Sequence, residues 1–181
     1  LEFSDGSIYV GSIYHGKPSG FGQLFLDKFV LYQGEFLDGK RHGKGRQIGP
    51  NGVRYVGEWN QDKYSGNGEL TMQESTYIGG FCNGVYHGKG VLNHHDGHFY
   101  EGEWSHGKKH GCGSLKSNTG TYVGSFYYNL KQGLGILTEL NGNVYSGSWR
   151  TNLRHGQGLY TSEGEMYDGQ WQRDKKHGHG K

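Results

Sequence analysis

The feature that most constrains this chain is an internal repeat that keeps one register through eight copies. Each copy opens with Tyr-x-Gly-x, and the next residue is aromatic in every copy but the first, which has Ile13. A Gly-x-Gly begins eleven residues after each tyrosine, and the next tyrosine follows nine or ten residues after its second glycine. The eight tyrosines are Tyr9, Tyr32, Tyr55, Tyr77, Tyr100, Tyr122, Tyr145 and Tyr167. Repeats of this kind form arrays in which each copy packs against its neighbours.

Alternation within each copy predicts a pair of β-strands. Residues i, i+2 and i+4 of a strand share a face, so the tyrosine, the glycine and the aromatic residue of the first segment point the same way. The Gly-x-Gly segment continues this face and ends in Leu or Tyr160, with Gln47 as the polar exception. Because glycine has no Cβ, we expect the Tyr and Trp rings to lie flat against the backbone beside it. The opposite face carries small or polar residues such as Glu58, Glu103 and Ser148.

Turn residues separate the two strands of each copy at a fixed distance. Three residues after the aromatic position stands a residue type that tolerates positive φ, for which we predict a left-handed conformation. These residues are Gly16, Gly39, Asp62, Gly84, Gly107, Asn129, Asn152 and Asp174. The junctions between copies vary in length and carry pairs such as Asn51-Gly52 and Asp96-Gly97, which are typical of hairpin turns.

Composition argues against several classes of protein. Hydrophobic residues make up 31% of the 181 residues and 36 are glycine, so a thick layered core is not expected. The 14 tyrosines and four tryptophans argue against a disordered chain. No apolar run approaches the roughly 20 residues of a membrane span, so any membrane contact is expected to be peripheral. Cys82 and Cys112 are too few for a disulfide framework, which favours free thiols in a reducing, cytoplasmic compartment.

The repeat resembles that of the MORN (membrane occupation and recognition nexus) family, which combines Tyr-x-Gly-x-Trp, Asn/Gly-Lys-x-His-Gly and Gly-x-Gly. The resemblance covers residues 5–180. The sequence departs from it at Ile13 and where Ser19, Ser65 and Gln132 replace the His before Gly-x-Gly. It implies one repeat array over residues 1–181, folded as an all-β, elongated, single-layer antiparallel meander of β-hairpin repeats that twists into a rod with a groove. The chain starts without Met and ends abruptly, so we expect a fragment of a longer protein.

In such a meander, the segments that follow the aromatic residues lie along one edge. We expect these to be eight six-residue loops, at 14–19, 37–42, 60–65, 82–87, 105–110, 127–132, 150–155 and 172–177. They hold 12 of the 19 Lys and Arg but 3 of the 17 Asp and Glu, a net charge of +9 that leaves −7 elsewhere. The richest positions of this predicted basic edge are Lys40, Arg41, His42, Lys108, Lys109, His110, Arg150, Arg154, His155, Arg173, Lys175, Lys176 and His177.

This basic edge is a candidate contact for anionic phospholipid headgroups. Each basic residue near a membrane surface adds about 1 kcal/mol, and phosphoinositide binding is also suggested for the family that the chain resembles. The alternative is that the segments are solvated turns whose histidines bond to a neighbouring loop. We see no exposed apolar wedge beside the charges, so lipid binding by this edge is expected to be weak and salt-sensitive.

Aromatic residues offer a second candidate surface. An aromatic groove could hold a partner peptide or helix, as the resemblance implies for some relatives; the alternative is that these rings are the core. Its residues are Tyr55, Trp59, Tyr100, Trp104, Tyr145, Trp149, Tyr167 and Trp171. The resemblance also implies a homodimer through the C-terminal repeats, with Tyr145, Trp149, Tyr167 and Trp171 at the contact, and a cytoskeletal, motor or scaffold partner.

Catalytic, metal and nucleic-acid sites are not expected. The Gly-x-Gly copies open no helix, so they are not phosphate or dinucleotide loops, and no catalytic set stands out from the repeat. The turn with His94, His95 and His98 is rich in ligand types but lacks zinc spacing, and we expect no metal or cofactor. Nucleic-acid binding is not expected because the rings should be packed.

We therefore interpret the chain as a non-catalytic scaffold at a membrane–cytoskeleton boundary. Its expected location is cytoplasmic, as a peripheral membrane or cytoskeleton-associated protein. The alternative is a protein-interaction module that uses the aromatic groove without a lipid role.

Overall fold

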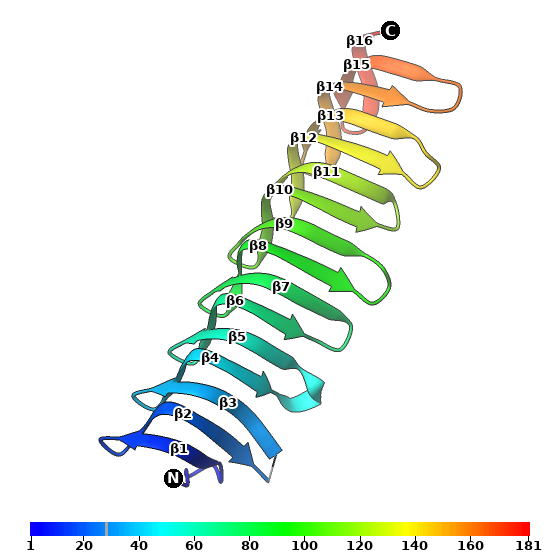
Figure 1. Ribbon diagram of the computed structural model, residues 1–181. Helices are drawn as coiled ribbons and strands as arrows, with labels where there is room; N and C mark the ends of the chain where they lie inside the picture. The colour runs from blue at the N-terminus through cyan, green and yellow to red at the C-terminus, as the bar shows by residue number, and fades with distance from the viewer. Residues whose placement is uncertain (28) are drawn as a thin grey trace. The chain divides into compact units, whose positions relative to one another are not determined.

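The computed structural model describes residues 1–27 and 29–181, and these residues form one antiparallel sheet in which 16 strands follow chain order. Figure 1 shows each strand beside the next one in sequence. One 3-10 turn, η1 (Pro50–Gly52), interrupts the strands. The all-β antiparallel meander expected from the sequence is confirmed. The strands are β1 (Ile8–Tyr14), β2 (Lys17–Leu26), β3 (Phe29–Leu37), β4 (Lys40–Ile48), β5 (Arg54–Asn60), β6 (Lys63–Thr71), β7 (Ser75–Cys82), β8 (Val85–His94), β9 (Phe99–Ser105), β10 (Lys108–Ser117), β11 (Gly120–Tyr127), β12 (Leu130–Glu139), β13 (Val144–Arg150), β14 (Leu153–Thr161), β15 (Met166–Gln172) and β16 (Lys175–Gly180).

The sheet divides into two compact units. Unit 1 comprises Leu1–Gly88 and unit 2 comprises Lys89–Lys181, so the boundary falls within β8. The sequence predicts one array over 1–181, and the division leaves four of the repeated tyrosines in each unit. Each unit is described by itself below.

Turns within the repeats are tighter than expected. All eight predicted left-handed residues have positive φ, between 66° and 85°, and the residue before each one is also left-handed, with φ of 47–52°. Two successive residues of this kind make a type I′ hairpin turn, whose twist matches that of the flanking strands. The six-residue loops predicted from the sequence are therefore wrong: Lys40, Lys108 and Lys175 are already the first residues of β4, β10 and β16.

The first glycine of each Gly-x-Gly also differs from expectation. Instead of continuing the strand pattern beneath the rings, Gly43 has φ +57° at a register shift between β3 and β4. This β-bulge places two extra residues, Gly43 and Lys44, in β4. The Glu35 carboxylate packs against Gly43 and accepts a hydrogen bond of 2.8 Å from the backbone N–H of Lys44. The bulge is thus stabilised by a carboxylate on the face of the sheet away from the rings.

The second glycine and the glycine of Tyr-x-Gly lie under the tyrosine ring, as predicted. Gly34 and Gly45 pair across β3 and β4, and a Cβ added at Gly45 would overlap the Tyr32 ring. The Tyr32 hydroxyl donates to the carbonyl of Glu35 at 2.9 Å. All eight repeated tyrosines make this bond to the carbonyl three residues on, at 2.8–3.0 Å.

Aromatic residues join each repeat to the one before it. In unit 1, the Trp59 ring packs edge-on against Tyr55 and Tyr32, with centroids 5.1 and 5.2 Å apart, and its Nε1 donates to the carbonyl of Gly45 at 3.2 Å. In unit 2, Trp149 repeats this arrangement with Tyr145 and Tyr122. The core of each unit is therefore a ladder of rings coupled between nearest neighbours.

Candidate functional site

The rings assigned to the predicted aromatic groove lie in the core. Seven of the eight are at most 5% exposed, and Tyr167 is half-buried. Trp104 and Trp171 also use their indole N–H groups, which donate to the carbonyls of Gly90 and Gly158. A partner on this face would first meet the residues that cover the rings.

In the second to eighth repeats, one residue lies over the core Tyr or Trp rings, and we call these seven the ring-covering residues. Tyr64 and Tyr86 stack on Tyr55 and Tyr77 with centroids 3.8 Å apart. Cations take the same place in other repeats, over Tyr or Trp rings at 4.4–5.3 Å. These cations are Arg41, Lys109, Lys131, Arg154 and Lys176.

The 13 residues of the predicted basic edge do not form one surface. In the β3–β4 pair, Arg41 stands opposite buried Phe36, whereas His42 stands opposite exposed Glu35, so the two side chains leave the sheet on different faces. The same alternation separates Lys109 from His110 in β10. The structure therefore brings Arg41, Lys109, Arg154 and Lys176 to the aromatic face, and places Lys40, Lys108, Arg150, Arg173 and Lys175 exposed at the turns.

Turn residues of one repeat clamp the ring-covering residue of the repeat before it. The backbone N–H of Asp62 donates to the carbonyl of Arg41, and the Asp62 Oδ1 accepts from the backbone N–H of Arg41, both at 3.0 Å. Asn129, Asn152 and Asp174 make the same two bonds to Lys109, Lys131 and Arg154. This clamp was not predicted; its signal in the sequence is Asp or Asn in place of Gly at the left-handed turn position.

Charge at these clamps takes two forms. Arg41 pairs with Asp62, with Nε and Oδ1 2.9 Å apart, and Arg154 pairs with Asp174 at 3.2 Å. At the other two clamps, the backbone N–H groups of Lys109 and Lys131 bond instead to the neutral amide side chains of Asn129 and Asn152. Burial lowers the pKa of the Lys109 ammonium and of the Lys131 ammonium.

The turns of unit 2 carry exposed apolar side chains beside free cations. We define the turn edge of unit 2 as residues 105–108, 127–130, 150–153 and 172–175, successive turns linked by the clamps. Tyr127 and Tyr128 are 56% and 41% exposed, and Leu130 and Leu153 are both 37% exposed. The Lys108 ammonium lies 5.4 Å from the Tyr128 ring centre. The expectation that no apolar wedge accompanies the charges is therefore wrong, because Tyr127 and Leu130 pair at the exposed end of their hairpin and Tyr128 lies in the turn between them.

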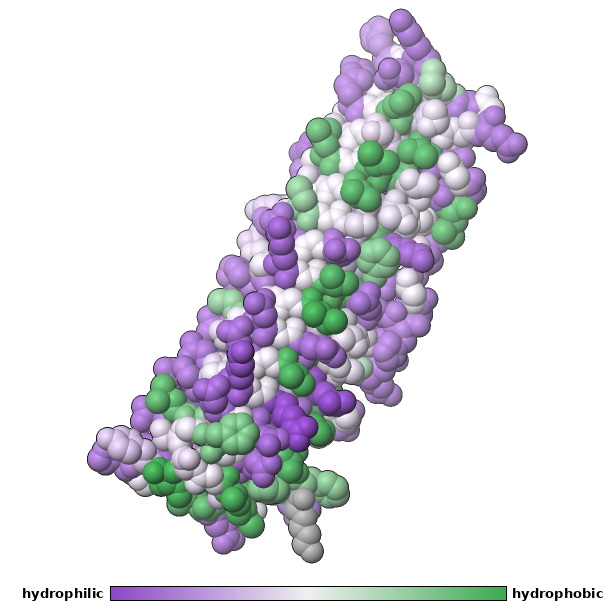
Figure 2. Space-filling view, viewed as in Figure 1, coloured by the Kyte–Doolittle hydropathy of each residue, from purple (hydrophilic) through white to green (hydrophobic). Residues whose placement is uncertain are grey.

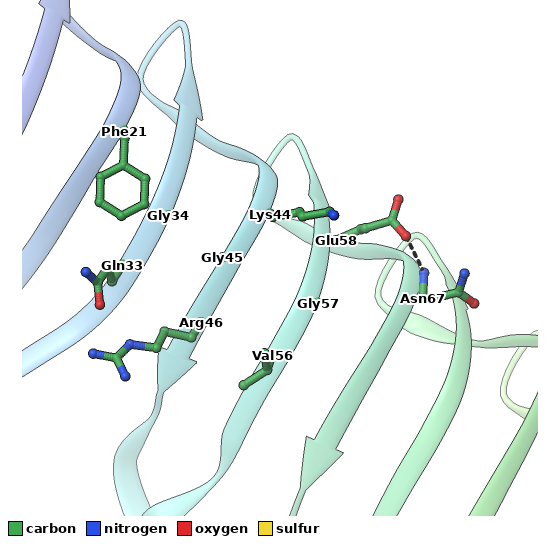
Figure 3. Close-up of a pocket in the computed structure, with 10 residues that line it drawn as sticks. All are labelled: Phe21, Gln33, Gly34, Lys44, Gly45, Arg46, Val56, Gly57, Glu58 and Asn67. Atoms are coloured by element: carbon green, nitrogen blue, oxygen red, sulfur yellow. Dashed lines mark hydrogen bonds between the residues drawn. The ribbon is translucent and has the colours of Figure 1, made fainter.

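The face opposite the aromatic core holds a shallow hollow in unit 1, which was not predicted from the sequence. Figure 3 shows Lys44 and Arg46 of β4 beside Val56 and Glu58 of β5, with glycine backbone between them. The Glu58 carboxylate accepts from the backbone N–H of Asn67 at 2.9 Å. These side chains occupy variable positions of the repeat, which carry no motif. On the corresponding face of unit 2, Val123, Leu134 and Ile136 are 47–70% exposed, and Figure 2 shows such apolar groups as green among purple.

The histidine-rich turn between β8 and β9 is held by its own aspartate. Asp96 Oδ1 accepts from the backbone N–H of His98 at 3.0 Å, and its Oδ2 lies 3.2 Å from the His98 ring. Among the residues that the structure describes, no three His, Cys, Asp or Glu side chains are grouped as metal ligands would be. Within the same residues, no helix has the length and apolar character needed to cross a membrane.

Comparison with known proteins places the repeats in a family. A family model described as MORN repeat matches residues 9–25, 32–54, 55–73, 77–99, 100–121, 122–144, 145–164 and 167–181. No curated protein matches the chain. The matched segments span most of the 181 residues and begin at the eight repeated tyrosines. The chain therefore belongs to the MORN-repeat family, whose repeats form interaction and scaffold modules and are generally non-catalytic.

Proposed function

We propose that this chain is a non-catalytic scaffold that uses the turn edge of unit 2 to bind anionic phospholipid headgroups at a membrane–cytoskeleton boundary. The observation that carries the proposal is the exposed Tyr127–Tyr128 pair among cations that the protein does not neutralise. Tyrosine rings favour the boundary between water and lipid. Basic residues beside them add attraction to anionic lipid.

The charges of the turn edge support this assignment. Lys108, Arg150, Arg173 and Lys175 are exposed, and in the described part of the chain no carboxylate lies within ion-pair distance of them. The sequence places one acid on the turn edge, Asp174, and that carboxylate is bonded to Arg154. Binding is therefore expected to combine a salt-sensitive electrostatic part with a salt-resistant part from the rings and leucines.

Sedimentation with phosphatidylcholine vesicles, with and without a phosphoinositide, tests the electrostatic part. The chain should bind only the anionic vesicles. Replacing Lys108, Arg150, Arg173 and Lys175 with alanine should weaken binding by about 1 kcal/mol, or roughly fivefold, per residue. A matched control replaces four exposed cations elsewhere, Lys44, Arg46, Arg54 and Lys116. Equal losses in both variants would mean that total charge governs binding, and would refute the turn edge as the site.

The apolar part is tested by a second variant, Tyr127→Ser with Tyr128→Asn. Asparagine tolerates the left-handed conformation of residue 128, where φ is 47°, so the turn should keep its shape. At low salt the variant should still bind anionic vesicles, whereas at high salt it should bind less than the wild type. Identical salt curves would show that the rings stay out of the lipid.

A homodimer through the C-terminal repeats stays part of the proposal. Tyr145, Trp149 and Trp171 are at most 5% exposed, so a second copy would contact the residues around them more than the rings themselves. Multi-angle light scattering should give twice the chain mass of 20.2 kDa. A mass of one chain at every protein concentration would exclude the dimer.

A further inference from the structure

Unit 2 has two clamps in which asparagine stands where other clamps have aspartate. Arg41 and Arg154 are clamped by Asp62 and Asp174, whereas Lys109 and Lys131 are clamped by Asn129 and Asn152. The clamp geometry is the same in all four: the side-chain Oδ1 accepts from the backbone N–H at 2.8–3.0 Å. An amide oxygen accepts this bond as a carboxylate does. The asparagines therefore satisfy the backbone and leave out the negative charge.

The missing charge leaves two cations without a counter-ion. Among the residues that the structure describes, no carboxylate lies within ion-pair distance of the Lys109 or the Lys131 ammonium. The Lys109 ammonium lies 5.3 Å from the Tyr100 ring centre, and that of Lys131 lies 4.9 Å from the rings of both Tyr122 and Trp149. Ring faces attract cations weakly, by roughly 0.5–1 kcal/mol at exposed sites. The lysines are thus held in place but not neutralised.

The two lysines also repel each other. Burial lowers the pKa of the Lys131 ammonium, the Asp174 carboxylate opposes that shift, and the charge of Lys109 adds to it. Asp174 is itself bonded to Arg154, so its negative charge is already matched. Two half-buried like charges on one face, in adjacent repeats, are stabilised by any anion that lies between or across them.

We propose that Lys109 and Lys131 form a two-point site for an extended acidic segment of a partner protein, lying across the aromatic face of unit 2. The lysines stand on β10 and β12, two strands apart in the sheet order, which corresponds to about 9.5 Å along the sheet. In a polyproline II segment, residues i and i+3 lie on the same side about 9.3 Å apart. Aspartate or glutamate at these positions would place one carboxylate on each ammonium. Lys131 was not among the residues singled out from the sequence.

This site is independent of the proposed lipid contact because it uses the aromatic face rather than the turn edge. The probe is a synthetic proline-rich peptide with glutamate at i and i+3, titrated calorimetrically into the full chain. A peptide with glutamine at both positions is the control for charge. The acidic peptide should bind, and the glutamine peptide should bind at least about tenfold more weakly. Equal affinity of the two peptides would overturn the proposal.

The chain itself supplies the decisive variant, Asn129→Asp with Asn152→Asp. It recreates the clamps of Asp62 and Asp174 and should keep the fold while supplying both lysines with internal counter-ions. Affinity for the acidic peptide should fall at least about tenfold. The matched control, Asn118→Asp with Asn141→Asp, adds the same charge at exposed positions of unit 2 away from the lysines. Unchanged affinity in the first variant, or an equal loss in the control, would overturn the site.

Vesicle sedimentation of the turn-edge variant, in which alanine replaces Lys108, Arg150, Arg173 and Lys175, separates this inference from the lipid proposal. That variant should lose vesicle binding and still prefer the acidic peptide over the glutamine peptide, whereas Asn129→Asp with Asn152→Asp adds acids to the turn edge and should weaken vesicle binding as well as peptide binding. If the turn-edge variant instead loses its preference for the acidic peptide, the exposed cations of the turn edge hold the peptide, and the two-lysine site is refuted. If no variant or wild type binds vesicles, the lipid proposal fails while the peptide measurement still decides the acidic site.

Discussion

Glycine at the centre of each strand pair is the residue on which the packing of this chain depends. The Tyr100 ring covers Gly102 and Gly113, which pair across β9 and β10, and a Cβ at either would come within 2.6 Å of the tyrosine hydroxyl oxygen. Closeness of this kind leaves no room for a methyl group. The exposed Gly164 is the opposite case, since a Cβ there would meet nothing within 4 Å.

Gly113→Ala is therefore expected to destabilise unit 2 by roughly 1–3 kcal/mol, the usual range for overpacking. The Tyr100 ring must move, which also strains its hydrogen bond to the carbonyl of Glu103. Gly164→Ala has room for its methyl group and should leave stability unchanged or slightly higher. Urea unfolding of both variants measures the difference. Equal midpoints would show that the ring accommodates the methyl group without loss.

At the scale of the element, the type I′ turn does more than reverse the chain. Its second residue reaches back to the preceding repeat through the backbone N–H, and Asp or Asn adds a second bond through the side chain. Asn152, for example, donates to the Lys131 carbonyl at 3.0 Å and accepts from the Lys131 N–H at 2.8 Å. Each turn is thus a connection between hairpins as well as within one.

Asn152→Gly should retain the left-handed turn and lose only the side-chain bond. The expected loss is about 0.5–1.5 kcal/mol, and the Lys131 amide should exchange its hydrogen faster. Asn152→Ala should lose more, because alanine disfavours φ of 70°. Hydrogen exchange of the two variants tests this order. An unchanged Lys131 amide in the glycine variant would mean that water replaces the side chain at no loss.

The strands and turn residues could be predicted from the sequence, whereas the points at which the strands begin and end could not. Fixed spacing between Tyr and Gly-x-Gly determined the strands, the shared face and the left-handed turn residues, because these follow from strand alternation and glycine sterics. Polar segments such as 37–42 suggested loops, yet Lys40 and Arg41 continue the strand pairing with Leu37 and Phe36. Because Lys40 and Arg41 are strand residues, neighbouring cations project from opposite faces of the sheet. The predicted basic edge therefore does not form one surface. Clamp bonds depend on contacts between repeats that one repeat's sequence does not display.

For the whole molecule, the repeat places the same group, a tyrosine hydroxyl, in each copy. These hydroxyls should determine how folding stability changes at high pH. Burial raises the pKa of Tyr100, Tyr122 and Tyr145 to about 12, above the ordinary 10.0. Burial also raises the pKa of the corresponding tyrosines of unit 1. Each hydroxyl donates to a backbone carbonyl, and that bond requires its proton. The folded state therefore favours the neutral form of every repeated tyrosine named here.

Stability should consequently fall steeply with pH above 10. Below pH 10 both states hold the tyrosine protons, so the contribution is fully present; between 10 and 12 the unfolded chain loses protons that the folded chain keeps, and stability declines as pH rises. Ultraviolet absorbance of tyrosinate and circular dichroism, followed together through this range, test the prediction. Ionisation of the buried tyrosines should coincide with loss of the β-sheet signal. If Tyr100, Tyr122 and Tyr145 ionised near pH 10 with the sheet intact, their hydroxyl bonds would not be coupled to folding.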